Sequence, residues 1–274
     1  MDEALAQWLA LRERIDFASR SERLTRLIAK RLGGCDPLHA IDLATGTGSN
    51  IRYLVPRLPS ANQQWLAVDR SQLLLDLAGV QVAGTGIGGR PDLTTRQANL
   101  GALDDPSLFA SRQLVTASAL LDLVSESWLR MLALRCRDAA VAAALFTITY
   151  NGESECSPAD DDDRMILELF NQHQHRDKGL GGPAAGPDAT DVAVREFADA
   201  GYRVETERSD WKIGPEDTGL QRKLIDGWAF AATETDPSAT RAIDAWRLRR
   251  LQHVDAGRSH IVVGHCDLAA WQAS

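Results

Sequence analysis

Two aspartates and the glycine-rich segment between them have residue types and a spacing that could do chemistry. The segment reads Ile41-Asp42-Leu43-Ala44-Thr45-Gly46-Thr47-Gly48-Ser49-Asn50. Gly46 and Gly48 would let the backbone turn tightly and approach a ligand closely. Asp69 lies 21 residues after Gly48, at the end of an apolar run, where a carboxylate can accept hydrogen bonds from both hydroxyls of a ribose. The pattern predicts a ribose-bearing ligand.

The same segment disfavours a dinucleotide. In the GxGxxG pattern the third glycine lies beneath a pyrophosphate, and counting from Gly46 that position falls on Ile51. Asp42 would repel a pyrophosphate, whereas it would attract the positively charged end of S-adenosylmethionine. An NAD-dependent oxidoreductase is therefore the less favoured alternative.

Asp42–Gly48 resembles the first motif of class I (Rossmann-like) S-adenosylmethionine-dependent methyltransferases, D/E-x-G-x-G-x-G, with Ala44 in place of the first glycine. Residues 96–100 resemble the family's adenine motif, and residues 116–124 resemble its fourth motif. The resemblance covers about residues 38–150. It implies an enzyme that uses S-adenosyl-L-methionine as its cofactor and transfers a methyl group to a small-molecule O or N acceptor.

The resemblance also implies a set of cofactor contacts. Asp69 would hold the ribose, Asn99 and the Leu100 backbone would hold the adenine, and we hypothesise that Arg20 meets the methionine carboxylate. The full set of expected contacts is Arg20, Asp42, Ala44, Thr45, Gly46, Gly48, Asn50, Asp69, Arg70, Asn99, Leu100 and Ser118. The alternative interpretation is a protein that binds S-adenosylmethionine or S-adenosylhomocysteine in this pocket without catalysing a reaction.

The candidate catalytic residues are Asp122, Tyr150 and His175, which follow the fourth strand, end the fifth strand and follow a helix. Each could act as a base or line an acceptor pocket, and each could equally be a solvated or packing residue. Arg176 and Lys178 could pair with an anionic acceptor or simply end a helix. We expect no metal, because the acidic run 160–163 is typical of a solvated loop.

Composition narrows the class of partner. The 274 residues carry a net charge of -8, which disfavours nucleic acid and anionic membranes as partners. The start MDEALAQWLA is not a signal peptide, no apolar stretch approaches a membrane span, and the four cysteines are scattered. We expect a cytoplasmic protein acting on a small molecule, and a homodimer is left open.

Short apolar runs alternate with helical segments, which predicts an α/β fold with a doubly wound, seven-stranded, mostly parallel sheet and helices on both faces. We expect one domain over 1–274, with an N-terminal helical cap (1–34) and an insertion or lid after the fifth strand (151–188). The expected strands are 39–43, 65–68, 93–97, 114–117, 141–149, 202–207 and 259–266. The expected helices are two within 1–33, then 50–55, 71–77, 125–137, 165–174, 190–200, 219–233 and 237–254, with a loop at 79–91.

Overall fold

A mixed β-sheet organises the chain in the computed structural model, which describes residues 2–84 and 91–272. The strand order is β3-β2-β1-β4-β5-β8-β6, and β7 pairs with β8. Pairings among β1 to β5 are parallel, whereas β6, β7 and β5 each pair antiparallel with β8. The strands are β1 (Leu38–Leu43), β2 (Gln63–Asp69), β3 (Asp92–Gln97), β4 (Leu114–Ser118), β5 (Ala143–Ser157), β6 (Tyr202–Arg208), β7 (Trp211–Ile213) and β8 (His260–Gln272).

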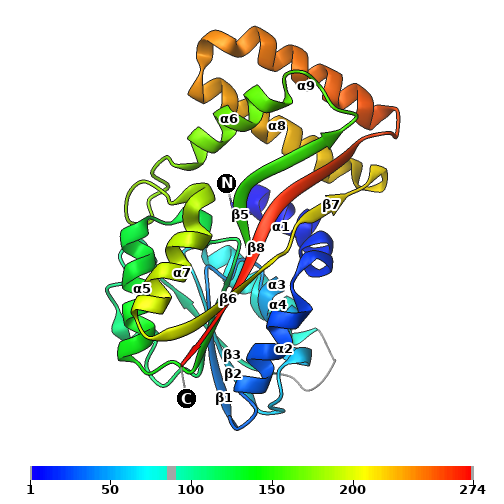
Figure 1. Ribbon diagram of the computed structural model, residues 1–274. Coiled ribbons are helices and arrows are strands. Elements are labelled where there is room, and N and C mark those ends of the chain that lie inside the picture. The colour runs from blue at the N-terminus through cyan, green and yellow to red at the C-terminus, as the bar shows by residue number, and fades with distance from the viewer. Residues whose placement is uncertain (1, 85–90, 273–274) are drawn as a thin grey trace.

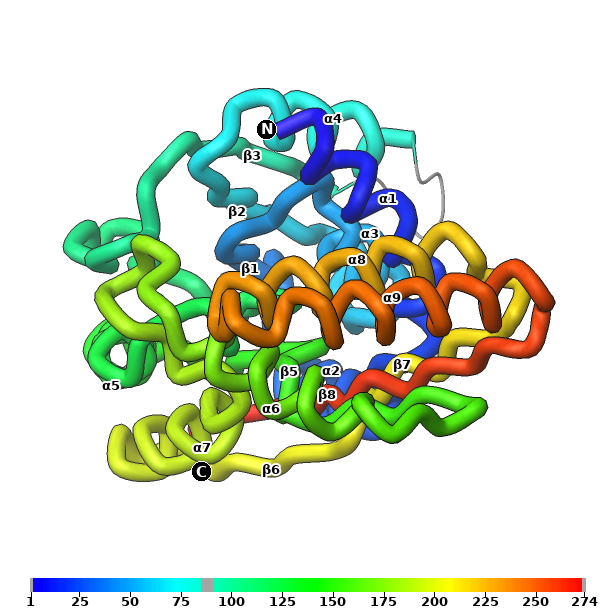
Figure 2. The backbone as a smooth tube through the Cα atoms, turned by 90° about the horizontal axis from the view of Figure 1, so that it is seen from above, coloured from blue at the N-terminus to red at the C-terminus, as the bar shows by residue number. Residues whose placement is uncertain are grey.

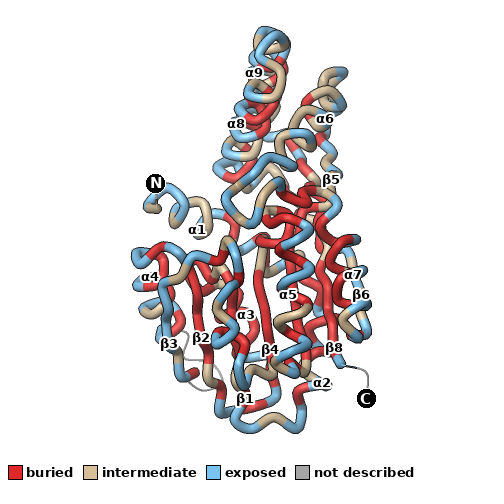
Figure 3. Tube along the Cα trace, turned by 90° about the vertical axis from the view of Figure 1, so that its left-hand side faces the viewer, coloured by how far each residue is buried: buried red, intermediate tan, exposed pale blue. Residues whose placement is uncertain are grey.

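Helices cover both faces of this sheet (Figure 1). The chain forms α1 (Asp2–Ser19), α2 (Glu22–Arg31), α3 (Ser49–Leu54), α4 (Gln72–Ala83), α5 (Glu126–Asp138), α6 (Asp163–Gln174), α7 (Ala189–Asp199), α8 (Thr218–Thr235) and α9 (Thr240–Asp255). Helices α5 and α7 pack on one face, and α2, α3 and α4 pack on the other. The inner strands β1, β2 and β4 between them are largely buried (Figure 3), whereas the edge strand β3 is mostly exposed, so two apolar layers cover the centre of the sheet.

Beyond the parallel part, β5 and β8 continue upward together and carry β7, α6, α8 and α9 (Figures 1 and 2). We call these elements the upper extension. A third apolar cluster, which includes Trp211, Trp228 and Trp246, packs inside it. Arg249 bonds to Asp160 and Asp162, and the fully buried Arg250 bonds to Asp163. The acidic run therefore ties β5 and α6 to α9.

The expected fold class is confirmed, with eight strands rather than seven among the described residues. Strand β5 is longer than predicted, because residues 151–157 continue it instead of opening an insertion. Asn151-Gly152 has the composition of a turn, yet a register shift against β8 between Tyr150 and Ser154 accommodates these residues within the strand.

The loop expected at 79–91 was also wrong in part. Helix α4 continues through Gly79 to Ala83, and residues 85–90 lie outside the described part of the chain. A glycine costs a helix only about 1 kcal/mol, and the burial of Ala78 and Val82 offsets that cost. In the described residues no helix is long and apolar enough to cross a bilayer.

Candidate functional site

A cavity of about 840 Å³ opens at the carboxyl ends of the parallel strands. Strand β1 has β2 on one side and β4 on the other, so the chain reverses its winding there. In such sheets a ligand binds where the strand order reverses. The residues that line the cavity are Leu5, Trp8, Leu9, Arg12, Asp16, Asp42, Ala44, Thr45, Gly46, Thr47, Ser49, Asn50, Asp69, Arg70, Leu74, Gln97, Ala98, Asn99, Leu100, Ser118, Ala119, Leu120, Leu123, Lys178, Gly179 and Leu180.

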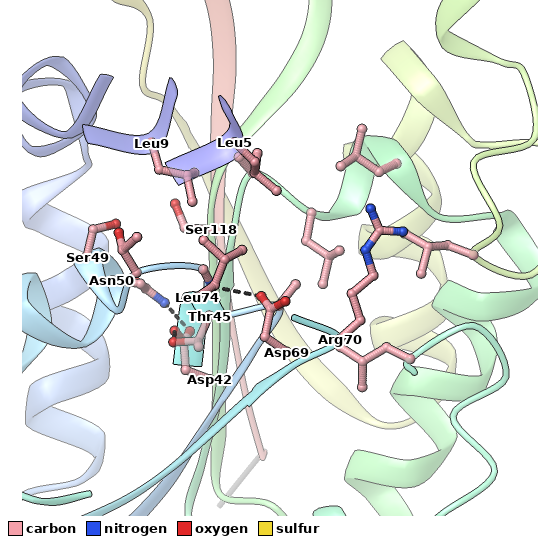
Figure 4. Close-up of a pocket in the computed structure, with 18 of the residues that line it drawn as sticks. Leu5, Leu9, Asp42, Thr45, Ser49, Asn50, Asp69, Arg70, Leu74 and Ser118 are labelled. Carbon is pink, nitrogen blue, oxygen red and sulfur yellow. Dashed lines mark hydrogen bonds between the residues drawn. The ribbon is translucent and has the colours of Figure 1, made fainter. Parts of the chain in front are cut away.

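Asp42 places a negative charge beneath the glycine-rich loop (Figure 4). Its two carboxylate oxygens accept hydrogen bonds from Thr45 Oγ1 at 2.6 Å and Asn50 Nδ2 at 2.5 Å. Burial raises the pKa of Asp42 to about 6, although these two hydrogen bonds oppose the rise. Asp42 thus braces the loop and is ionised at neutral pH.

Asp69 lies beside the loop at the end of β2. Its Oδ2 accepts the Gly46 amide at 2.9 Å, and its Oδ1 accepts the Ser71 amide at 3.0 Å. A carboxylate has about four acceptor positions, so both oxygens keep capacity for a ligand. The carboxylate is therefore oriented by the backbone before any ligand arrives.

The loop itself requires an unusual backbone. Gly46 and Gly48 have φ of 55° and 78°, and Ala44 adopts φ of 51° in the same left-handed region. Ala119, after β4, has φ of 52° and also lines the cavity. Such conformations cost about 1–3 kcal/mol each for non-glycine residues and concentrate at functional sites.

Helix α1 forms one wall of the cavity, where Leu5 and Leu9 face the glycine-rich loop (Figure 4). A Cβ on Gly46 would come within 2.8 Å of Leu9 Cδ1, so helix and loop are in close contact. Ser71 Oγ donates to Asp2 at one end of α1, and Arg52 pairs with Glu13 farther along. The helix is thereby anchored to α3 and to the N-terminus of α4.

The loop after α6 provides another part of the wall. Lys178, Gly179 and Leu180 line the cavity, and the Ser125 amide donates to the Leu180 carbonyl. Asn99 accepts the Gly101 amide through Oδ1, and Trp128 Nε1 donates to the Leu100 carbonyl. These contacts use neither the Asn99 Nδ2 group nor the Leu100 backbone amide as a donor.

Most of the expected cofactor residues come together here: Asp42, Ala44, Thr45, Gly46, Asn50, Asp69, Arg70, Asn99, Leu100 and Ser118 all line the cavity. Two do not. Gly48 faces α4, where a Cβ would meet Val82 at 2.9 Å. Arg20 is buried over the Tyr53 ring, and its Nε and Nη2 have no hydrogen-bond partner among the described residues.

The candidate catalytic residues lie outside the cavity lining. Tyr150 donates its hydroxyl to Asn171 inside the upper extension, and burial raises its pKa. His175 is about half exposed, and its Nδ1 lies 3.2 Å from the Ala184 carbonyl. Asp122 lies in the chain between the wall residues Leu120 and Leu123 and is buried, with Oδ1 unpaired among the described residues. Burial raises the pKa of Asp122, and nearby Lys178 opposes that rise.

Sequence reasoning missed Trp8, Arg12, Asp16, Gly179 and Leu180 as cavity residues, whereas it named Lys178 as a possible partner of an anionic acceptor. The helical spacing of Leu5, Trp8, Leu9 and Arg12 indicates an amphipathic helix. It does not say which surface that helix covers. The residues around Lys178 in the sequence did not show that, unlike Arg176, it lines the cavity.

Comparison with known proteins defines the fold. No protein-family model matches the chain, and no curated protein matches its sequence. Among solved structures, YcgJ from Bacillus subtilis is 13% identical with a TM-score of 0.51, covering 93% of this chain and all of that one. A candidate methyltransferase from Bacillus halodurans C-125 is 14% identical with the same TM-score and the same coverage. The chain therefore has the class I methyltransferase fold.

Proposed function

We propose that the protein binds S-adenosyl-L-methionine and transfers its methyl group to a small-molecule O or N acceptor. One observation carries the proposal: a glycine-rich loop at the sheet's reversal point, with buried Asp42 beneath it and Asp69 fixed beside it. This site has a negative charge for a cation and acceptors for ribose hydroxyls. The buried Ile51 occupies the position of the third glycine that a pyrophosphate-binding loop needs.

Different residues of the cavity would bind different parts of such a cofactor. Asp69 accepts the ribose hydroxyls, Asp42 favours the cationic methionine end, and Asn99 with the Leu100 amide faces the adenine edge. When bound, the cofactor supplies an electrophilic methyl group. Helix α1 and residues 178–180 form two walls of the site, which would hold the acceptor in line with the cofactor.

Asp122 is the group we propose to receive a proton from the acceptor. Asp122 is buried outside the cavity lining, and burial raises its pKa while the Tyr150 backbone amide opposes that rise. A carboxyl whose pKa is raised toward neutrality is a better base than an exposed one. To reach an acceptor, this side chain would have to turn between Leu120 and Leu123.

Calorimetric titration with S-adenosylmethionine and S-adenosylhomocysteine tests the proposal. We expect Asp69→Ala to weaken binding of both more than tenfold, because a hydrogen bond to a charged group contributes about 1.5–3 kcal/mol. Asp76→Ala removes an equivalent charge from the exposed side of α4 and should leave binding unchanged. Absence of binding to the wild-type protein would refute the proposed function.

A cofactor-binding protein without turnover is the second candidate. The observation that favours it is that Asp122, Tyr150 and His175 all lie outside the cavity lining. Release of S-adenosylhomocysteine in the presence of an acceptor distinguishes an enzyme from such a protein.

A further inference from the structure

Two cationic side chains from distant parts of the sequence meet in the same cavity. Arg12 comes from α1, and Lys178 comes from the loop after α6. The cofactor site described above assigns a role to neither of them. Their remaining hydrogen-bonding capacity indicates what else the cavity holds.

Arg12 is 9% exposed and is held from one side. Its Nε donates to Asp16 Oδ2 at 2.8 Å, and its guanidinium lies 5.3 Å from the centre of the Trp211 ring. Within residues 2–84 and 91–272, neither terminal nitrogen of Arg12 has a hydrogen-bond partner. The side chain is thus fixed in place with its donors still available.

Lys178 is also partly enclosed, and burial lowers its pKa while Asp122 opposes that change. Its ammonium donates to Gln174 Oε1 at 3.2 Å, which leaves further donor capacity. The neighbouring Arg176 differs, since it bonds to the Glu234 carboxylate and backbone and lies outside the cavity lining. Of these two cations, Lys178 is the one placed to meet a ligand.

The carboxylates nearby do not consume these donors. Asp16 accepts from Arg12 through Oδ2 and from Trp211 Nε1 through Oδ1. Asp122 lies behind the lining and makes no ion pair within hydrogen-bond distance of Lys178. Apolar side chains complete this part of the wall: Trp8, Leu120, Leu123 and Leu180.

We propose that the methyl acceptor is an oxyanion, a small apolar molecule whose carboxylate or phosphate is bound by Lys178 and Arg12. The inference rests on the proposed function, since it names the acceptor class of the same cavity. Charge-assisted hydrogen bonds to an oxyanion are short and strong in an enclosed site. The apolar wall would hold the body of the molecule.

The test uses the full-length protein saturated with S-adenosylhomocysteine. The probes are 4-hydroxybenzoate, 4-hydroxyphenylacetate and indole-3-acetate, each against its neutral amide, with phenyl phosphate to separate phosphate from carboxylate recognition. We expect at least one anion to bind about tenfold or more tightly than its neutral counterpart. Lys178→Met should remove that preference while leaving S-adenosylhomocysteine affinity unchanged.

Two variants control for charge and folding. Lys212→Met removes a charge from the exposed face of β7 and should keep the anion preference. Lys178→Arg keeps the charge and should retain binding within a few-fold. Loss of anion binding in Lys178→Arg, or equal binding of anion and amide by the wild-type protein, would overturn the inference. Failure of the wild-type protein to bind S-adenosylhomocysteine would instead refute the proposed function.

Discussion

The two sides of the cavity are built differently. The floor consists of the ends of β1, β2 and β4, where Asp42, Asp69 and Ser118 lie on adjacent parallel strands. The roof consists of Trp8, Arg12 and Asp16 from α1 together with residues 178–180. The floor residues lie at the ends of paired parallel strands, whereas the roof residues come from α1 and from a loop more than 150 residues later in the chain. The positions of the floor residues can therefore be predicted from the strand pattern of a parallel sheet, whereas those of the roof cannot.

The upper extension offers the strongest test of whether the floor is independent of it. Arg250→Met removes a fully buried cation that bonds to Asp163. We expect the free energy of unfolding to fall by about 3 kcal/mol, because the partly buried Asp163 carboxylate and the Pro158 carbonyl both lose the buried guanidinium that donates to them. Denaturant unfolding measures this change, and S-adenosylhomocysteine affinity should stay within about threefold.

Arg247→Met is the control for that variant, because Arg247 pairs with Asp226 at the surface. An exposed pair contributes about 0–1 kcal/mol, so little should change. If Arg250→Met abolished cofactor binding in a protein that was still folded, floor and extension would have to be treated as a single unit.

The contact between floor and roof is tested at Gly46. Gly46→Ala places a methyl group at φ of 55° and against Leu9. We expect stability to fall by about 1–2 kcal/mol and S-adenosylhomocysteine binding to weaken about fivefold or more, measured by thermal melting and calorimetry.

Gly79→Ala is the matched substitution within α4, where a Cβ would meet nothing within 4 Å. It should stabilise the protein by about 0.5–1 kcal/mol and leave ligand affinity unaltered. If the two alanine variants had the same stability and the same S-adenosylhomocysteine affinity, the contact between Leu9 of the roof and Gly46 of the loop would have no energetic consequence.

The charge of the floor predicts a pH dependence. The pKa of Asp42 is raised to about 6 by burial, so its carboxylate gains a proton as the pH falls through that value. A cationic ligand binds the ionised form, so S-adenosylmethionine affinity should be about tenfold weaker at pH 5 than at pH 8. Calorimetry across this range checks it, and Asp42→Asn should bind weakly with no step near pH 6.

The same contrast explains which parts of the site could be predicted. Asp42, Gly46 and Asp69 lie at strand ends separated by one helix, and the topology of a parallel sheet brings such ends together. Arg12 and Lys178 are 166 residues apart, and their meeting depends on packing rather than on local pattern. Arg20 illustrates the limit, since it was expected at the cofactor and lies instead over Tyr53.

The fold was predictable for a similar reason. Apolar runs in β1, β2 and β4 have clear helical segments after them, whereas β5 runs through Asn151-Gly152 only because β8 pairs with both sides of that irregularity. Trp211–Ile213 is too short to be recognised as a strand without its partner. Local composition loses its predictive power where a distant strand decides the outcome.

The position of α1 affects how this protein should be handled in the laboratory. Asp2 already contacts Ser71, and Leu5 reaches the cavity within the first turns. A purification tag joined ahead of Asp2 would begin close to the wall of this cavity and would compete with small molecules for it. The same closeness makes that end of the chain a suitable attachment point for a fluorophore that reports on ligand entry.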